Sequence, residues 1–194
     1  MVSTDSEAIA EISRNCGAKV PFARSPETSG DFATTADVIK EVIEKYREQG
    51  RVFHEFCCIY PTAPLLTPDR LKEAYKKFVS EKADMLIPVV RFPAPPQRGM
   101  MIRDQKLIYA HPENISTRSQ DLEPMYYDSG QFYFLASSFF NSTVKEKKII
   151  PFILSPWEAQ DINTQEEWDM AERKFRLIAK YGHACYHFRE NCLS

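Results

Sequence analysis

Residues 56–68 read FCCIYPTAPLLTP, and this stretch decides the fold. Its opening run, FCCIY, is apolar and short, which is typical of a core strand buried on both faces of a sheet. Pro61 and Pro64 stiffen the loop that follows. Thr67 before Pro68 is an N-cap followed by proline at the first helical position. The stretch therefore predicts a buried strand, a rigid connection and a helix.

The same alternation of strands and helices continues on both sides of this stretch. In chain order we predict a helix capped by Asp5 or Ser6, a helix capped by Thr34 or Thr35 that ends at Gln49-Gly50, strands at 85–90 and 132–135, and a last helix opened by the capping box Thr164-x-x-Glu167. Strands that alternate with helices predict an α/β fold with a mostly parallel sheet covered on both faces. Such sheets bind ligands at the carboxyl ends of their strands.

Composition sets the class of protein. The chain has 194 residues and a net charge of −2, which suits one domain and gives no basic field for nucleic acid. No apolar run reaches the roughly 18 residues that span a bilayer, and residues 1–13 lack the blocks of a signal peptide. We therefore expect a cytoplasmic protein that binds neither membranes nor nucleic acid.

Five cysteines support the same compartment, because an odd number without regular spacing is not a disulfide framework. Cys57 and Cys58 lie in the apolar run and are interpreted as core residues. The tail resembles a metal cluster, but it has no CxxC pair, so we favour an ordinary tail over a zinc site. Its residues are His183, Cys185, His187 and Cys192.

The loops that follow the predicted strands and helices carry a resemblance. They are PFARSPETSGDFA at 21–33, YPTAPLL at 60–66, RSQDL at 118–122, DSGQFY at 128–133 and AQDINT at 159–164. Their order and spacing together resemble the CMP-sialic acid synthetase family of cytidylyltransferases. The resemblance covers nearly the whole chain, and it implies a fold like that of nucleotide-diphospho-sugar transferases, in three layers.

Three details are most similar to the pseudaminic acid branch of that family. They are RFP at 91–93 with PPQR at 95–98, the run DSGQFY, and DINT at 161–164. The resemblance implies transfer of CMP from CTP to a nonulosonic acid, with pseudaminic acid first and sialic or legionaminic acid as alternatives. The anomeric hydroxyl of the sugar acid attacks the α-phosphate of CTP and pyrophosphate leaves.

The family normally opens with a strand and a loop of the type Ala-Arg-Gly-Gly-Ser-Lys, which cradles the triphosphate. This chain begins at what would be the second strand. We therefore expect residues 1–194 to form a single cytidylyltransferase domain that is incomplete at its N-terminus. A rival reading from a different class is a remnant without turnover, acting as a dimerising or sugar-binding module.

The resemblance also implies magnesium and a set of nucleotide contacts. Asp161 is the candidate metal ligand, with Asn163 as a weaker or water-mediated contact; the alternative is that Asp161 only assists the Thr164 cap. Arg24 and Asp31 flank a loop expected to approach the nucleotide, or else an ordinary surface loop. Thr62 is expected to contact base or sugar, or to be part of a rigid connector.

The sugar acid carries a carboxylate, for which arginine is a bidentate partner, and Arg98 and Arg118 are the candidates. Gln131 and Tyr133 are expected to line the sugar pocket; the alternative is a strand with alternating core aromatics. No residue is assigned as general base.

The segment 92–127 is long, rich in proline and poorly periodic, and such segments are usually functional. By resemblance it is an insertion that exchanges with a second subunit and completes the neighbouring sugar site, which implies a homodimer. The alternative, a disordered exposed loop, is weakened by apolar residues such as Met100, Ile102 and Leu107.

Overall fold

A computed structural model of the chain describes residues 1–140 and 146–181, and the chain divides into two compact units. Unit 1 is Met1–His54 and unit 2 is Glu55–Ser194. None of the helices among the described residues is long and apolar enough to cross a membrane. The predicted metal-like tail falls outside the described residues. Within them, no group of three or more His, Cys, Asp or Glu side chains is arranged to hold a metal ion.

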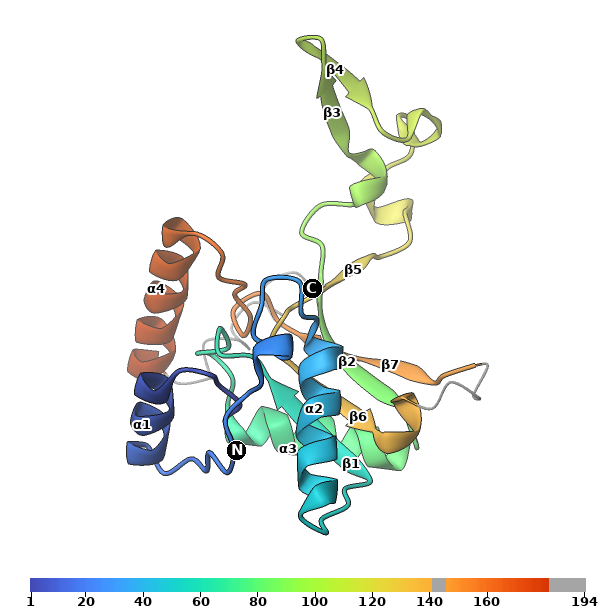
Figure 1. The fold of residues 1–194 in the computed structure, drawn as a ribbon. Helices are drawn as coiled ribbons and strands as arrows, with labels where there is room; N and C mark the ends of the chain where they lie inside the picture. Colours follow the sequence, from blue (N-terminus) through green and yellow to red (C-terminus); the bar gives the residue numbers. More distant parts are fainter. Residues whose placement is uncertain (141–145, 182–194) are drawn as a thin grey trace. The chain divides into compact units, whose positions relative to one another are not determined.

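Unit 1 holds two helices joined by a loop (Figure 1). These are α1 (Glu7–Asn15) and α2 (Thr35–Glu48), with the short 3-10 turn η1 (Pro26–Thr28) between them. Ser6 caps α1 by accepting the N–H of Ile9, and Thr34 forms a reciprocal capping box with Asp37 at the start of α2. Both helices begin at one of the two capping residues predicted for each, and α2 ends at Gln49 as predicted.

Unit 2 is a mixed sheet with helices. In chain order its elements are β1 (Glu55–Ile59), α3 (Pro68–Ser80), β2 (Met85–Arg91), η2 (Pro96–Arg98), β3 (Met100–Arg103), β4 (Lys106–Tyr109), η3 (Pro112–Asn114), η4 (Ser119–Asp121), β5 (Tyr126–Asp128), β6 (Phe132–Ala136), η5 (Ser137–Phe140), β7 (Ile149–Leu154) and α4 (Gln165–Tyr181). The strands run in the order β1-β6-β2-β5, and β7 pairs with the other edge of β2 (Figure 1). The predicted α/β class, the helices and the strands at 56–60, 85–90 and 132–135 are confirmed, but the strand expected at the start of the chain is wrong, because α1 is the first element there.

The prediction of a mostly parallel sheet is wrong for the described strands. Only β2 and β7 pair in parallel; β6 is antiparallel to both β1 and β2, and β5 is antiparallel to β2. The physical reason is the long insertion after β2, which returns the chain to the end of the sheet where β2 stops, since Tyr126 at the start of β5 pairs with Arg91 at the end of β2. An apolar run shows that a strand is buried but not in which direction it runs. Cover on both faces of the sheet stays a prediction.

The core of unit 2 lies between α3 and one face of the sheet. Ala74 and Phe78 on α3 are buried against Leu86 of β2 and Phe134 of β6. The same cluster continues through alternate residues of β7, whose exposed and buried positions alternate along the strand. Burying a side chain of this size stabilises a fold by roughly 1.5–3 kcal/mol, so this face holds the sheet together.

The expectation of a strand buried on both faces at 56–60 is wrong. β1 pairs with β6 on one side only among the described strands, and it alternates between exposed and half-buried residues. Cys57 is exposed and Cys58 half-buried, so the core interpretation of this pair is also wrong for Cys57. The apolar content of FCCIY indicated a strand correctly but overstated its burial, because burial depends on neighbours that the run does not encode.

A proline interrupts the pairing of β2. Pro88 is fully buried in the middle of this strand, yet it has no N–H to donate to a neighbour. On that side, β6 pairs with residues 85–86 and β5 with residues 89–91, so the two partners are separated by a break at 129–131. Ser129 crosses the break and donates both its N–H and its hydroxyl to the carbonyl of Pro88, each at 3.0 Å.

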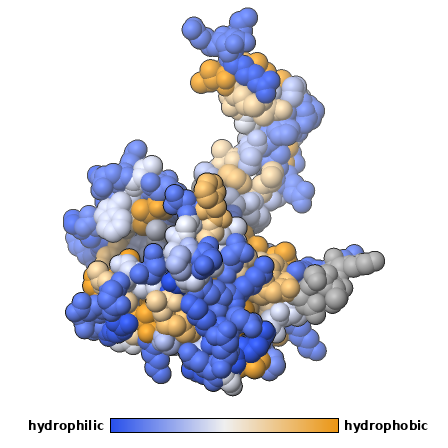
Figure 2. Space-filling view, viewed as in Figure 1, coloured by the Kyte–Doolittle hydropathy of each residue, from blue (hydrophilic) through white to orange (hydrophobic). Residues whose placement is uncertain are grey.

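The insertion between β2 and β5 is ordered as a hairpin. β3 and β4 pair with each other through a turn in which Asp104 and Gln105 have φ of +49° and +61°, as a tight hairpin turn requires. Its apolar side chains Met100, Ile102 and Leu107 are exposed, and Figure 2 shows apolar surface on this part of the chain. The sequence predicted neither this hairpin nor β5 and β7.

Candidate functional site

The break opposite Pro88 forms the centre of the site in unit 2. Asp128 ends β5 beside Val89, near the carboxyl end of β2. Its Oδ1 accepts the N–H of Gly130 at 2.9 Å, a local turn that aspartate favours. Gly130 has a φ of +62°, which a side chain would make strained. The turn therefore leads the chain out of β5 and back into β6 within three residues.

Tyr133 reaches back across this turn. Its hydroxyl donates to Oδ2 of Asp128 at 2.8 Å, and its ring lies edge-on to that of Tyr60, with centroids 5.4 Å apart. Burial, and then the bond to the Asp128 carboxylate, raise the pKa of Tyr133 well above its usual range. The phenol is therefore neutral at physiological pH, and it can both donate to Asp128 and accept from a ligand.

Gln131 joins this turn to the loop before α4. Its side chain is 0% exposed, and its amide nitrogen donates to the carbonyls of Ser129 at 3.3 Å and Gln160 at 3.1 Å. Its Oε1 is buried and finds no partner among the described residues. The contacts that this side chain makes here are therefore with the main chain, and contact with a sugar stays a prediction.

Asp161 directly follows Gln160, whose carbonyl accepts the Gln131 amide, and it lies next to Gly130. A side-chain carbon built at Gly130 would lie 3.5 Å from Oδ1 of Asp161. Oδ1 accepts the N–H of Ile162 at 3.1 Å, and Oδ2 accepts the Asn163 side-chain amide at 2.9 Å. The capping box of α4 is formed as predicted, with Glu167 accepting the N–H groups of Asn163 and Thr164. Asp161 is thus oriented by its neighbours and exposed to solvent.

The residues at this position fit a magnesium ion that arrives with phosphates. Mg²⁺ keeps several waters and needs only one or two protein carboxylates. The exposed Asp161 offers one carboxylate, and the side-chain oxygen of Asn163 offers a neutral ligand. The described residues offer no larger acidic cluster here, and binding of magnesium stays a prediction.

Thr62 follows β1 on the loop to α3 and is half-buried. The N–H of Tyr60 donates to the carbonyl of Gln131 at 2.9 Å, which extends the β1–β6 pairing by one residue. The loop that carries Thr62 therefore begins directly beside the turn at 129–131. We call the side chains of Asp128, Gln131, Tyr133, Asp161 and Asn163 the rim cluster.

The two predicted carboxylate-binding arginines both lie in the insertion. Arg98 lines a cavity of about 420 Å³ together with Pro95, Met100 and Tyr109, and its guanidinium donates to the Ser119 hydroxyl at 3.2 Å. Arg118 instead forms a two-pronged ion pair with Asp121, at 2.7 and 3.2 Å. Arg98 is therefore the better placed of the two to meet a ligand, because the carboxylate of Asp121 already occupies Arg118.

The remaining candidates lie in unit 1. Arg24 is half-buried, and its guanidinium donates to the hydroxyl of Ser3 at 3.2 Å and to the carbonyl of Ser3. A guanidinium has five N–H donors, so others remain for a ligand. Asp31 is exposed on the turn after η1. The two residues flank the same loop, as the sequence predicted.

Sequence reasoning missed two side chains that hold these loops, Asp128 at the end of β5 and Glu41 on α2. Asp128 was quoted within DSGQFY but not assigned a role; the spacing Asp-x-Gly, typical of a turn closed by the aspartate itself, was the available signal. Glu41 was read only as part of a helix. The only sequence pattern that includes Glu41 is the pair with Lys45, four residues later. Such pairs are common on helices, so this one does not indicate that Glu41 also binds the loop at residues 25–28.

Comparison with known proteins identifies the family of the chain. The model of the family described as Cytidylyltransferase matches residues 1–172. The chain belongs to the cytidylyltransferase family. Two curated cytidylyltransferases from Campylobacter jejuni subsp. jejuni are similar to it, both named pseudaminic acid cytidylyltransferase. The one from serotype O:2 is 38% identical over 135 residues, and the one from serotype O:23/36 is 32% identical over 183 residues.

These matches cover 69% and 91% of this chain but 58% and 78% of the two relatives. The first match thus spans little more than half of the relative's length. An N-acylneuraminate cytidylyltransferase from Danio rerio is 28% identical over 93% of this chain and 42% of its own. A solved CMP:2-keto-3-deoxy-manno-octonic acid synthetase complexed with CTP matches with a TM-score of 0.60 at 14% identity, over 92% of this chain and 80% of that one. That likeness shows a shared fold.

Proposed function

We propose that the protein transfers CMP from CTP to a nonulosonic acid, with pseudaminic acid as the sugar. The observation that carries the proposal is the rim cluster, in which Asp161 lies beside the turn closed by Asp128 and Tyr133, in a cytidylyltransferase chain. The two relatives named for pseudaminic acid are 38% and 32% identical, over 135 and 183 residues, against 31% over 149 residues for an N-acylneuraminate enzyme from Streptococcus agalactiae and 28% for the one from Danio rerio, which favours the first sugar.

The proposed reaction needs positioning and neutralisation of charge more than covalent chemistry. Asp161 and Asn163 would hold Mg²⁺, which when bound neutralises charge on the phosphate oxygens. Arg24 donates from its remaining N–H groups to CTP, and Asp31 and Thr62 contact the nucleotide from their loops. Each of these contacts uses a side chain that the structure leaves half-buried or exposed.

Recognition of the sugar acid falls to the insertion and to the rim cluster. Arg98 binds the carboxylate in the cavity that it lines, since a guanidinium matches two carboxylate oxygens at once. Tyr133 accepts a hydrogen bond from a sugar hydroxyl or donates one to it, while Asp128 fixes the orientation of the tyrosine. Gln131 holds the main chain of the rim cluster in place, and Arg118 contributes to binding of the carboxylate only after release from Asp121.

We further propose that two copies associate through the insertion. The hairpin exposes Met100, Met101, Ile102, Leu107 and Ile108, and apolar surface of this kind marks association sites in soluble proteins. Residues 92–127 would then complete the sugar site of the second copy. Sedimentation of the wild type and of an Ile102→Lys, Leu107→Lys variant tests this; a monomeric wild type rejects it.

Release of pyrophosphate tests the function. The 194-residue chain and a version extended upstream of Met1 are each mixed with CTP, Mg²⁺ and either pseudaminic or sialic acid. We expect turnover with pseudaminic acid, lost on addition of EDTA. If only sialic acid supported turnover, sialic acid would replace pseudaminic acid as the proposed substrate. If neither version released pyrophosphate with either sugar, the enzyme would be rejected in favour of a sugar-binding or dimerising module.

A further inference from the structure

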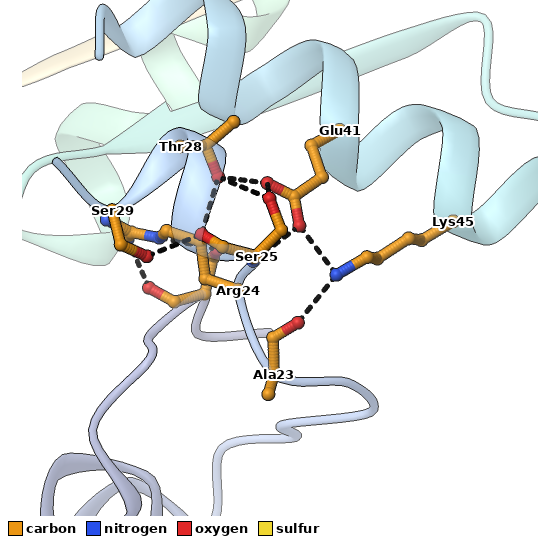
Figure 3. Close-up of polar contacts among 8 residues, drawn as sticks. Ala23, Arg24, Ser25, Thr28, Ser29, Glu41 and Lys45 are labelled. Carbon is orange, nitrogen blue, oxygen red and sulfur yellow. Dashed lines mark hydrogen bonds and ion pairs between the residues drawn. The ribbon is translucent and has the colours of Figure 1, made fainter. Parts of the chain in front are cut away.

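A carboxylate on α2 fastens the loop that follows Arg24. The side chain of Glu41 is only 13% exposed and faces residues 25–28 (Figure 3). Its Oε1 accepts the N–H of Ser25 at 2.8 Å; its Oε2 accepts the Ser25 hydroxyl at 3.1 Å and also the Thr28 hydroxyl. One side chain therefore binds both ends of the turn η1.

Lys45, one helical turn further along α2, extends this hold to the other side of Arg24. Its ammonium pairs with the Glu41 carboxylate and donates to the carbonyl of Ala23 at 2.6 Å (Figure 3). The N–H of Arg24 itself donates to the carbonyl of Thr4 at 3.0 Å. The main chain is thus fixed at Ala23, Arg24 and Ser25, three successive residues.

The charge of Glu41 is part of this arrangement. Burial disfavours ionisation, but the bonds from Lys45, Thr28 and Ser25 outweigh it and lower the pKa of Glu41 to about 2. A solvated ion pair on the same helix provides the contrast. Glu44 pairs with Arg47 at 2.6 Å, but both side chains are more than half exposed and the pair holds no loop.

We propose that Glu41 is a positioning residue for nucleotide binding. It fixes the loop 25–28 before CTP arrives, and thereby fixes the place from which the Arg24 guanidinium reaches the nucleotide. A loop that is already ordered loses less conformational freedom on binding, so the affinity for CTP is higher. The inference rests on the proposed function, since it concerns the same nucleotide loop.

Four variants test this role: Glu41→Gln, Thr28→Val, the double variant, and Glu44→Gln as the matched control. Glutamine keeps the size of Glu41 but loses the charge and one acceptor oxygen. We expect the Kd for CTP, measured by calorimetry, to rise about tenfold in Glu41→Gln, as for one lost charge-assisted hydrogen bond. Exchange of the Ser25 amide hydrogen should accelerate in the same variant. Glu44→Gln should match the wild type in both measurements.

The double variant tests whether Glu41 acts on CTP binding through its bond with Thr28. If Glu41 acts through Thr28, the double variant should bind CTP no more weakly than Glu41→Gln, because the two changes remove one interaction. Strict additivity, or CTP binding by Glu41→Gln equal to that of Glu44→Gln, would overturn the inference while leaving the proposed function intact. A wild type that fails to bind CTP with Mg²⁺ would instead overturn the proposed function, and the inference with it.

Discussion

The hydroxyl of Tyr133 donates a hydrogen bond to Oδ2 of Asp128 at 2.8 Å, while Oδ1 of the same carboxylate receives the N–H of Gly130 at 2.9 Å. One carboxylate thus fixes both the turn that leaves β5 and the first outward-facing side chain of β6. The orientation of Tyr133 is consequently set by the backbone of the turn rather than by a ligand.

Tyr133→Phe removes the hydroxyl and leaves the ring in place. We expect the KM for the sugar acid to rise about tenfold, with the KM for CTP unchanged, because the proposed hydrogen bond between the Tyr133 hydroxyl and a sugar hydroxyl is lost. Tyr75→Phe is the matched control, since the Tyr75 hydroxyl also donates to a carboxylate, that of Glu55, at 2.9 Å. Equal kinetics for the two variants would remove Tyr133 from the sugar site.

Asp161→Asn keeps the shape of the side chain and removes its charge. We expect pyrophosphate release to fall at least about 100-fold and to require more Mg²⁺. Loss of a residue that only orients a metal ligand lowers metal affinity or activity by about 10–100-fold, and loss of the ligand itself should lower them at least as much. A Mg²⁺ titration of the rate measures both effects. Asp169→Asn, an exposed site on α4, should leave the titration unchanged. An unaltered titration for Asp161→Asn would leave this aspartate as a helix-capping assistant only.

Gln131→Met keeps the volume of a buried side chain and removes its hydrogen bonds. The carbonyls of Ser129 and Gln160 then lose their donor, and we expect the free energy of unfolding of unit 2 to fall by about 1–3 kcal/mol. Urea unfolding followed by tryptophan fluorescence measures this, because Trp157 and Trp168 both lie in unit 2.

The matched control for Gln131 is Gln97→Met. Gln97 also donates to a main-chain carbonyl, that of Glu123 at 2.8 Å, and also has a buried side-chain oxygen without a partner among the described residues. It lies in the insertion, so its replacement should leave the rim cluster, and hence the Mg²⁺ dependence of turnover, unchanged. Equal losses of turnover in both variants would contradict a specific role for the hydrogen bond between the Gln131 amide and the Gln160 carbonyl.

Glu41→Gln should also change how stability depends on pH. The pKa of Glu41 is lowered from 4.5 to about 2 in the folded protein. A lowered pKa contributes stability in full above pH 4.5, and the contribution is lost as the pH falls toward 2. The wild type should therefore exceed Glu41→Gln in stability by up to about 3 kcal/mol at pH 6, and by much less at pH 3.

Hydrogen exchange of the α2 amides measures this stability, because unit 1 contains no tryptophan. Glu44→Gln carries the same change of charge on the same helix, and its difference from the wild type should stay small and flat with pH. A difference for Glu41→Gln that does not shrink in acid would mean that its carboxylate gains nothing from Lys45, Thr28 and Ser25.

Local features of this chain were predictable from sequence, and long-range ones were not. The caps at Ser6, Thr34, Thr67 and Thr164 were read correctly because a cap depends on residues within four positions of it. The direction of β6 was not predicted, since it is set by an insertion of more than thirty residues. The hairpin was missed because its apolar residues face solvent and lack a core to alternate against.

The site follows the same rule. Asp161 and Asn163 were predicted together because both lie in the run DINT, and the structure shows that they contact each other. The burial of Gln131 depends on Gln160, 29 residues away, and the role of Glu41 depends on Ser25, 16 residues away. No sequence pattern predicts a contact at either of these separations. The sequence identified the loops, and the structure was needed to show what holds them.

Pro88 gives the strand pairing of unit 2 a unique alignment. A slip of β6 by one residue along β2 would turn Phe132 and Phe134 out of the core. It would also place opposite Pro88 a strand residue whose carbonyl needs a hydrogen bond that proline, without an N–H, cannot donate. The same slip would dissolve the turn that holds Asp128 and Tyr133. Misaligned chains would therefore be both unstable and inert, so that errors in folding are removed by quality control rather than surviving as enzymes of altered specificity.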